Sequence, residues 1–382
     1  MHQNIVQLRA EDFEEAMDFL NLAFSVHSAH DFARLLPLLY RPTDRHMSCN
    51  YAIRKNGRIR AVVGLFPLTW QVGDAKLRVA GIGGVSTHTN DRGTGLMSAL
   101  MPHCVAQMRA QGYHLSYLGG RRQRYLYFGY ERCGLKTSYS VSPTNLKHCF
   151  EGSPDLRLVP IEADDSKNIA RAKALHDAQS VHCHRPLEDF YLHCLSWSSK
   201  PFAALDGDGR MVGYLVANAA SGYVAEVHAE KHTIALDMVR AWVEKEGSVN
   251  LSAHPLSGGL AHALGRCCEQ AEVRASGNWQ IFDWVAVVDA LLQAQHLTAP
   301  LVKGTVVLGI EGYGALQLQV DGGAARCIAT DAAADLLCDA PTAMRLLFGP
   351  LPPTHVLPLP AAAAPLESWC PLPLTWTSQD GV

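Results

Sequence analysis

The chain has 382 residues and a formal net charge of −3, with 18% charged and 48% hydrophobic residues. This length predicts two or three domains with a sizeable core. The composition is that of a globular protein in water, and the charge balance excludes a nucleic-acid-binding protein. The N-terminus lacks the charged-then-apolar order of a signal peptide, and no apolar run reaches about 18 residues, so we expect a cytoplasmic protein with no membrane partner.

The eleven cysteines are odd in number and show no repeated C-x-x-C, which predicts reduced and mostly buried thiols. Histidine and cysteine gather in one stretch, namely His176, His182, Cys183, His184, His193 and Cys194. His182 and His184 do not have the spacing of two ligands on one helix, and no second clean pair accompanies them. We therefore expect histidines on helix surfaces and no metal.

Apolar residues at helical spacing predict a helix over 11–24, and a second helical stretch follows at about 31–39. Asn56-Gly57 predicts a tight hairpin between strands at 51–53 and 59–65, because both residues accept a positive φ. A strand over 77–85, a glycine-rich turn, a helix to about 111 and a strand over 114–118 follow. Pro102 lies inside that helix and is expected to kink it.

The glycine-rich turn, Arg92-Gly93-Thr94-Gly95, is the most informative motif. Glycine lets the backbone approach a ligand, and the free N–H groups of the following helix favour an anion such as a pyrophosphate. Leu96-Met97 stand where a P-loop has Lys and Ser/Thr, and a seven-residue loop (Ser86 to Arg92) separates the turn from its strand, unlike a dinucleotide-binding fold. The remaining alternative is an ordinary strand-to-helix connection.

The hairpin pattern recurs at 202–205 and 211–216, followed by a strand over 223–228 and a helix over about 233–246. No glycine turn opens this helix, which suggests a second copy of the fold without its anion site. Further along, we expect a strand over 281–285, a helix over 287–295 and strands at 304–310, 315–320 and 326–330. Residues 332–348 should be helical with a break near Pro341, and 350–365 should be extended.

Arg92, Gly95 and Met97 occupy the diagnostic positions of motif A of the GNAT acetyltransferases, although Met97 replaces a smaller residue. The whole layout resembles the enhanced-intracellular-survival (Eis) group of that family. Three further segments carry this resemblance: Tyr125 to Tyr130, Leu346 to Gly349, and Pro371 to Leu374 with the chain end at Val382.

The resemblance implies an α/β (α+β) chain of tandem GNAT folds, each a mixed sheet flanked by helices, with a sterol-carrier-protein-like C-terminal domain. Residues 1–150 would be the catalytic domain, 151–295 a degenerate GNAT-like domain, and 296–382 the sterol-carrier-like domain, whose tail returns to the active site. It also implies a homo-oligomer, either a trimer or a hexamer.

By this resemblance the chain is an acetyl-CoA-dependent N-acetyltransferase that acts on a small-molecule amine, such as an aminoglycoside, or on a lysine. Coenzyme A would be held by Val85, Ser86, Thr87, Arg92, Gly93, Thr94, Gly95, Leu96 and Met97. Tyr125 would be the acid and the carboxylate of Val382 the base. A phenol is a weaker acid than a thiol, so a strong hydrogen bond to the thiolate is the safer description of Tyr125.

Candidate substrate contacts are Phe24, Asp31, Phe32, Tyr40, Trp70 and Asp380. Four alternatives stay open at this point. Tyr125, Tyr127 and Tyr130 could form an aromatic packing cluster, with packing expected for the last two, and the polar tail from Ser378 could be disordered. The chain as a whole could bind an acyl-CoA or a lipid without turnover, or act as a scaffold.

Overall fold

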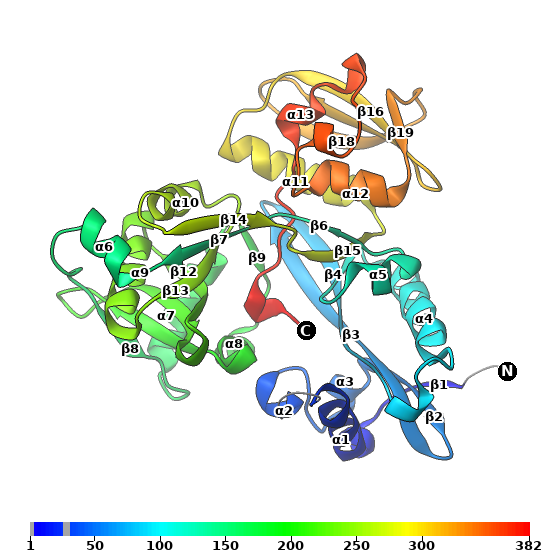
Figure 1. Cartoon of the computed structure of the whole chain (residues 1–382), viewed down its shortest axis with the longest axis horizontal. Coiled ribbons are helices and arrows are strands. Elements are labelled where there is room, and N and C mark those ends of the chain that lie inside the picture. The colour runs from blue at the N-terminus through cyan, green and yellow to red at the C-terminus, as the bar shows by residue number, and fades with distance from the viewer. Residues whose placement is uncertain (1–3, 26–30) are drawn as a thin grey trace.

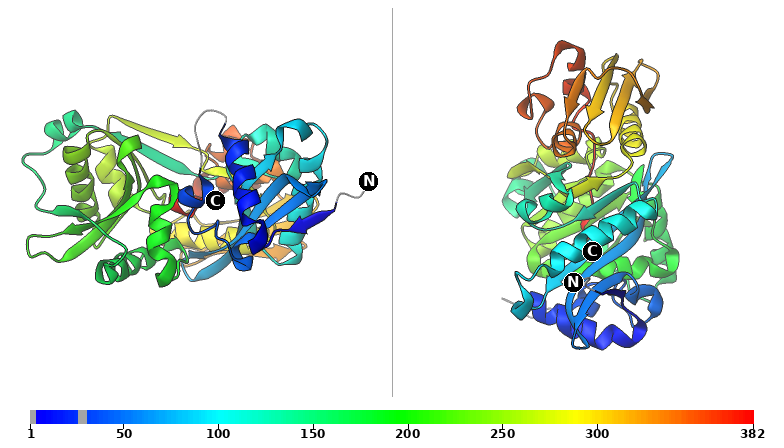
Figure 2. Two further views of the ribbon diagram at one scale, coloured as in Figure 1. Left: turned by 90° about the horizontal axis from the view of Figure 1, so that it is seen from below. Right: turned by 90° about the vertical axis from the view of Figure 1, so that its right-hand side faces the viewer.

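The computed structural model describes residues 4–25 and 31–382. The chain forms three bodies, each built on one sheet, and we call them the first, second and third units in the order of their main segments (Figure 1). The third unit lies at one end of the molecule, and the C-terminal segment runs from it to a position between the other two (Figures 1 and 2). The fold is therefore mixed α/β, as expected.

The first unit contains an eight-stranded sheet in the order β1-β2-β3-β4-β5-β15-β6, with β9 paired to β3. Its strands are β1 (Ile5–Gln7), β2 (Asn50–Lys55), β3 (Arg58–Val72), β4 (Ala75–Thr87), β5 (Leu115–Leu118), β6 (Glu131–Cys133), β9 (Val181–Cys183) and β15 (Gly277–Ile281). Its helices are α1 (Phe13–Phe24), α2 (Phe32–Leu35), α3 (Asp44–Met47), α4 (Leu96–Ala110) and α5 (Arg122–Tyr125).

The second unit has a seven-stranded sheet in the order β14-β7-β13-β12-β11-β10-β8. Its strands are β7 (Lys136–Val141), β8 (Arg157–Pro160), β10 (Lys200–Leu205), β11 (Met211–Asn218), β12 (Tyr223–Ala229), β13 (Val249–Ala253) and β14 (Gln270–Arg274). Its helices are α6 (Pro143–Cys149), α7 (Ser166–Asp177), α8 (Leu187–Leu195), α9 (His232–Glu246) and α10 (Gly258–Gly265).

The third unit has a four-stranded sheet in the order β18-β17-β16-β19. Its elements are β16 (Gly304–Ile310), β17 (Gly314–Val320), β18 (Ala325–Thr330), β19 (Leu336–Cys338), α11 (Trp284–Thr298), α12 (Ala340–Phe348) and α13 (Leu366–Trp369). One apolar cluster joins α11, α12 and this sheet to the ends of β3, β4 and β5. The third unit is thus fixed to one end of the first sheet.

Two strands leave the unit in which their neighbours in the sequence lie. β7 follows β6 directly along the chain but pairs with β13 and β14 in the second sheet. β15 follows β14 but lies between β5 and β6 in the first sheet. The first and second units therefore exchange strands around residues 134–136 and 275–277.

The structure confirms several predicted elements. They are the helix at 11–24, both hairpins, the strands leading into α4 and α9, and the three strands at 304–330. The strand predicted at 281–285 is wrong, because β15 ends at Ile281 and the carboxylate of Asp283 accepts from the N–H of Ala286 to cap α11. The long helix at 332–348 is also wrong. Its first part holds β19, and Pro341 lies in the first turn of α12 after the cap Asp339 instead of breaking a helix.

The second predicted helix, at 31–39, shortens to the single turn of α2. Residues 350–365 are broken by two 3₁₀ turns, Pro353–His355 and Ala361–Ala363. All eleven cysteines are free and most are buried, as expected of reduced thiols. No helix in the described ranges is long and apolar enough to cross a membrane.

Candidate active site

The central strands of the first sheet separate at a defined point. β4 pairs in parallel with β5 from Val79 and Leu115 to Ile82 and Leu118. β5 then ends while β4 continues to Thr87, still paired with β3. Within the described residues, the β4 backbone from residue 83 onward therefore has no strand partner on its β5 side. Its free N–H and C=O groups can hydrogen-bond an extended ligand there.

A bulge bends β4 inside this unpaired stretch. The register between β3 and β4 shifts between the pairs formed by Val62 and Gly64. Gly84 takes a φ of 59°, a conformation that favours glycine. The bulge re-aims the backbone of residues 84–86, close to the end of β4 at Thr87.

The glycine turn has the backbone that its sequence predicts. Gly93 and Gly95 have φ of 77° and 84°, and a Cβ at either position would meet open space. Gly95 is the N-cap of α4, so the first N–H groups of this long helix point out of the turn. Asp91, directly before the turn, fixes the preceding loop through ion pairs with Lys55 (2.8 Å) and Arg60 (2.5 Å). The turn is thus held in place with the free N–H groups of α4 at its end, an arrangement that suits an anion.

A cavity of about 880 Å³ opens beside the turn and the unpaired part of β4. Its lining includes five of the predicted cofactor residues, namely Val85, Ser86, Thr87, Arg92 and Met97. Of the predicted substrate residues it includes Phe24. The other four predicted cofactor residues, Gly93, Thr94, Gly95 and Leu96, do not line this cavity, and the Leu96 side chain is buried. The guanidinium groups of Arg92 and Arg124 give the cavity a positive character, which suits phosphate groups.

Tyr125 ends α5 next to this cavity and is 6% exposed. Its ring packs so closely on Gly120 that a Cβ there would lie 2.9 Å from Cε2. Arg122 fixes the helix by an ion pair with the buried carboxylate of Glu131. Burial raises the pKa of the Tyr125 phenol, although Arg124 acts in the opposite direction. This phenol therefore keeps its proton at neutral pH and can donate a hydrogen bond.

The other two tyrosines of the motif differ from each other. Tyr130 is fully buried and shares a hydrogen bond of 2.7 Å with Ser116, whose hydroxyl also donates to the carbonyl of Ala80. Its expected packing role is confirmed. Tyr127 is 88% exposed and lines the cavity, so the packing role expected for it is wrong.

The chain end reaches β4. A Cβ added at Gly81 would lie 2.7 Å from Cγ2 of Val382, and one added at Gly83 would lie 2.7 Å from its carboxyl carbon. Val382 also packs against the cluster that contains Phe66 and Tyr40. The terminal carboxylate thus lies on β4 beside the unpaired stretch. The tail before it is ordered by buried contacts, and the alternative of a disordered tail does not hold.

Aromatic side chains form a row beside the chain end. The ring centroids are 5.0 Å apart for Phe24 and Phe32, 5.6 Å for Phe32 and Tyr40, and 5.7 Å for Tyr40 and Phe66. The Tyr40 hydroxyl is buried without a hydrogen-bond partner among the described residues, and a Cβ at Gly84 would lie 2.8 Å from it. This row runs from Phe24 of α1 to Phe66 of β3 and forms a wall beside the chain end.

The other three predicted substrate contacts lie elsewhere. Trp70 is buried against Trp279 and Trp376, on the side of the third unit. Asp31 is exposed and caps α2 by accepting from the N–H of Arg34. Asp380 is 3% exposed and its carboxylate is bound by Arg185. Neither Trp70 nor Asp380 is open to an incoming amine.

One histidine cluster has metal-like geometry. His176, Glu226 and His228 each offer a ligand atom within 4.8 Å of the others. However, the guanidinium of Arg185 holds both oxygens of Glu226 and would lie beside a bound cation. Burial lowers the pKa of His176 to about 4, and His176 and His193 are 3% and 8% exposed, so the expected surface position of these two histidines is wrong.

Sequence reasoning missed part of the site. Arg124, Ser98 and Phe128 line the cavity, and Arg185 binds the tail. Arg124 precedes Tyr125 directly and could have been found from its charge. Arg185 could not, because it lies 195 residues from its partner Asp380.

Residues 4–133 match the model of an acetyltransferase (GNAT) domain. Comparison with curated protein sequences gave no match. Solved structures similar to this chain include a GCN5-related N-acetyltransferase from Kribbella flavida, with a TM-score of 0.71, 19% identity, and coverage of 99% of this chain and 98% of that one. A protein of unknown function from Enterococcus faecalis, described as a probable N-acyltransferase, gives 0.70, 16% identity and 98% coverage of both chains.

Eis1 from Mycobacterium abscessus is also similar, with a TM-score of 0.64, 15% identity, and coverage of 99% of this chain and 100% of that one. At these identities the structures establish the fold along the whole chain. The domain match covers the split strands, the glycine turn and Tyr125. Residues 4–133 are therefore a GNAT acetyltransferase domain, and the chain is an acyltransferase.

Proposed function

We propose that this chain is an acetyl-CoA-dependent N-acetyltransferase that acetylates a primary amine of a small molecule, such as an aminoglycoside, or of a lysine. The observation that carries the proposal is the meeting of three features at one strand. They are the unpaired end of β4, the glycine turn at α4, and the carboxylate of Val382 against Gly83.

The residues present fit coenzyme A. The cavity volume of about 880 Å³ lies within the range of pockets that bind cofactors and drug-sized ligands. Backbone N–H groups at the α4 terminus, with Arg92 and Arg124, suit a pyrophosphate. The free edge of β4 suits an extended amide-containing arm. When bound, acetyl-CoA supplies an activated acyl group and a thiol leaving group.

The roles of the chain's own residues follow from their surroundings. The protonated phenol of Tyr125 would donate a hydrogen bond to the departing sulfur, because its raised pKa opposes full proton transfer. The Val382 carboxylate would hold the acceptor ammonium and help to remove its proton, directly or through water. A backbone N–H of the bulge in β4 would stabilise the acyl oxygen. The row from Phe24 to Phe66 would bound the acceptor.

The resemblance to the Eis group supports four further parts of the proposal. These are a catalytic domain over 1–150, a degenerate domain over 151–295, a sterol-carrier-like domain over 296–382, and a cytoplasmic homo-oligomer. The second unit agrees with this division in having no glycine turn before α9. The sheets do not follow these boundaries strictly, because the first sheet also contains β9 and β15 from the range 151–295, and the second contains β7 from the range 1–150.

The test is release of free thiol from acetyl-CoA with aminoglycosides, polyamines, amino acids and a lysine peptide. Two variants accompany the wild type, namely Tyr125→Phe and a chain that ends at Asp380. We expect turnover with one class of amine and a loss of about 10²-fold or more in kcat in both variants. Binding of coenzyme A, measured by calorimetry, should be retained.

Tyr113→Phe is the matched control, because Tyr113 is a buried tyrosine under Arg78 and does not line the cavity. Its kcat should stay within about twofold of wild type. Full activity of Tyr125→Phe would overturn the assigned mechanism. Coenzyme binding without turnover on any amine would instead favour a carrier of acyl-CoA or lipid.

A further inference from the structure

The last residues of the chain lie between the first and second units and contact both. Trp376 packs on Tyr117 and Trp70 of the first unit, with ring centroids 5.4 and 6.3 Å away. Ser378 and Tyr223 of β12 share a hydrogen bond of 2.8 Å. The amide of Gln379 donates to three carbonyls around the end of α8, those of His193, Cys194 and Ser196, at 3.1, 3.0 and 3.1 Å. The tail is thus a fixed part of the interface.

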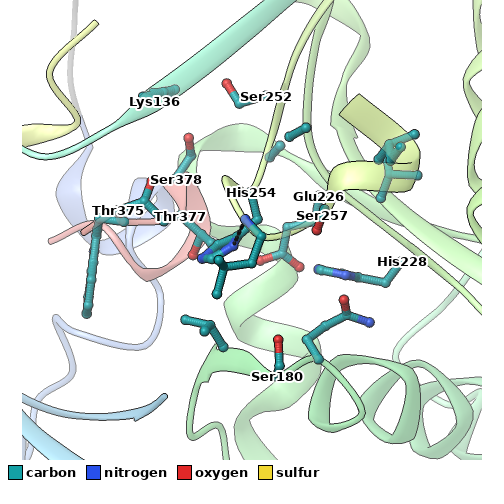
Figure 3. Close-up of a pocket in the computed structure, with 18 of the residues that line it drawn as sticks. Lys136, Ser180, Glu226, His228, Ser252, His254, Ser257, Thr375, Thr377 and Ser378 are labelled. Atoms are coloured by element: carbon teal, nitrogen blue, oxygen red, sulfur yellow. Dashed lines mark hydrogen bonds between the residues drawn. The ribbon is translucent and has the colours of Figure 1, made fainter. Parts of the chain in front are cut away.

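The second sheet splits in the same way as the first. β12 and β13 pair in parallel only at Tyr223 with Asn250 and at Val224 with Leu251, and β12 then continues to Ala229. In the first unit, the equivalent split between β4 and β5 opens into the large cavity. In the second unit it encloses a hollow of only about 90 Å³, which tail residues 375–378 help to line (Figure 3). The tail therefore covers the split of the second sheet.

One buried arginine fixes this tail to the second sheet. Arg185, between β9 and α8, is fully buried. Its Nε and Nη2 donate to the two carboxylate oxygens of Asp380 at 2.8 and 2.9 Å. Its Nη1 and Nη2 donate to Glu226 of β12 at 3.1 and 2.5 Å. A buried carboxylate that loses its partner costs several kcal/mol, so this triad strongly fixes Asp380.

Only Gly381 and Val382 follow Asp380. Two residues span at most about 7 Å, so the position of Asp380 determines where the terminal carboxylate can lie. We propose that Arg185 is a positioning residue: by holding Asp380 on the second unit, it places the carboxylate of Val382 against Gly83 in the active site of the first. The split of the second unit thereby serves as the holder of the tail. This inference rests on the proposed function for the catalytic role of that carboxylate.

The position of the tail can be tested without measuring activity. A serine carboxypeptidase is added to the full chain, and release of Val382 is followed by mass spectrometry. Asp380→Asn keeps the size of the side chain and leaves Arg185 paired with Glu226. We expect release at least about tenfold faster than from wild type, because one buried charge pair has been removed. Equal release rates would overturn the proposal.

Glu230→Gln is the matched control. Glu230 is a carboxylate of the second unit that forms ion pairs with two arginines, Arg171 and Arg210, and its ion pairs do not involve the tail. Its release rate should equal that of wild type. Arg185→Lys keeps the charge but loses the two-pronged contact, and its rate should lie between those of wild type and Asp380→Asn. A rate for Glu230→Gln as fast as that of Asp380→Asn would show general loosening and would overturn the assignment.

The catalytic consequence is tested by a double-mutant cycle. Asp380→Asn is measured in the full chain and in a chain that lacks Gly381 and Val382. In the full chain we expect kcat to fall about tenfold with an unchanged KM for acetyl-CoA, and in the shortened chain we expect no further fall. An equal fall in both chains would mean that Asp380 acts on structure alone and would overturn the positioning role.

The two proposals fail in different ways. If removal of Gly381 and Val382 leaves kcat unchanged, the proposed role of the carboxylate is wrong, and the release assay still decides whether Arg185 holds the tail. If removal abolishes turnover and Asp380→Asn changes neither release nor kcat, the proposed function stands and the positioning inference is overturned.

Discussion

Gly81 and Gly83 lie two positions apart on β4, so both face the same side of the sheet. The side chain of Val382 lies over the first and its carboxyl carbon over the second. Neither glycine has a positive φ, so neither is required by its backbone conformation. Their function at the residue scale is to leave room for the end of the chain, about 300 positions away in the sequence.

This close contact predicts a compensating pair of substitutions. In Gly81→Ala the new Cβ would lie 2.7 Å from Cγ2 of Val382, which must move. We expect kcat to fall about tenfold, since a small misplacement of a catalytic group is costly. Val382→Ala removes the two Cγ atoms but keeps the carboxylate, so the double variant should recover most of the activity. Steady-state kinetics on the four chains measures the effect, and a double variant no better than Gly81→Ala alone would count against it.

The local backbone of short motifs could be predicted from the sequence. Gly93, Gly95 and Tyr125 belong to short motifs, and the structure has the turn and the helix end that those motifs require. Asp380 was expected to face the substrate and instead pairs with Arg185. Such a partner cannot be found from spacing, because an ion pair between distant segments leaves no periodic signal in the sequence.

At the scale of the element, α4 contains a proline in an exposed position. Pro102 cannot donate to the carbonyl of Ser98, yet the helix continues from Leu96 to Ala110 around it. The interruption lies on the side facing water, where the carbonyl can be hydrated. The helix therefore keeps its buried face, which includes Leu100, Met101 and Cys104.

Pro102→Ala should stabilise the protein. Alanine restores the missing hydrogen bond and has the best helix propensity, so we expect the free energy of unfolding to rise by about 1 to 3 kcal/mol. Chemical denaturation of both chains measures this difference. Ala99→Gly, at the half-buried neighbouring site in the same helix, should shift the stability in the opposite direction. A destabilised Pro102→Ala would mean that α4 depends on the proline.

Short apolar segments explain the errors at this scale. Residues 281–285 contain four apolar side chains around Asp283, and periodicity over so few residues cannot distinguish a strand from a helix start. Asp283 is the N-cap of α11, and it therefore marks these residues as the start of a helix. Asp339 does the same for α12, so both helix boundaries were readable from capping residues and not from hydrophobicity.

At the scale of the whole molecule, the first two units are tied together by strands and by the tail. β15 lies between β5 and β6, and β7 lies between β13 and β14. The sequence shows that two similar folds follow each other but gives no sign of this exchange, because the pairing partners of β15 are more than about 140 residues away.

This interface buries histidines in their neutral form, and it should make stability depend on pH. Burial lowers the pKa of His176 and of His193 to about 4, and Arg185 acts in the same direction, while Asp380 and Glu226 oppose it. In the unfolded chain a histidine titrates near about 6.5. Between these values the unfolded state binds more protons, so the free energy of unfolding falls as the pH drops from about 6.5 toward 4.

We expect the free energy of unfolding to fall by about 1 kcal/mol per pH unit for each of these histidines. The denaturation midpoint, followed from pH 7 to pH 5, should fall with it. His193→Gln should flatten this dependence, because its side chain no longer titrates while its backbone carbonyl can still accept from Gln379. The lowered pKa of Asp380 adds a further loss only below about pH 4, since an unfolded aspartate stays charged above that value. A midpoint that does not change between pH 7 and pH 5 would mean that folding does not lower the pKa of either histidine, and the neutral packing around Arg185 would then be wrong.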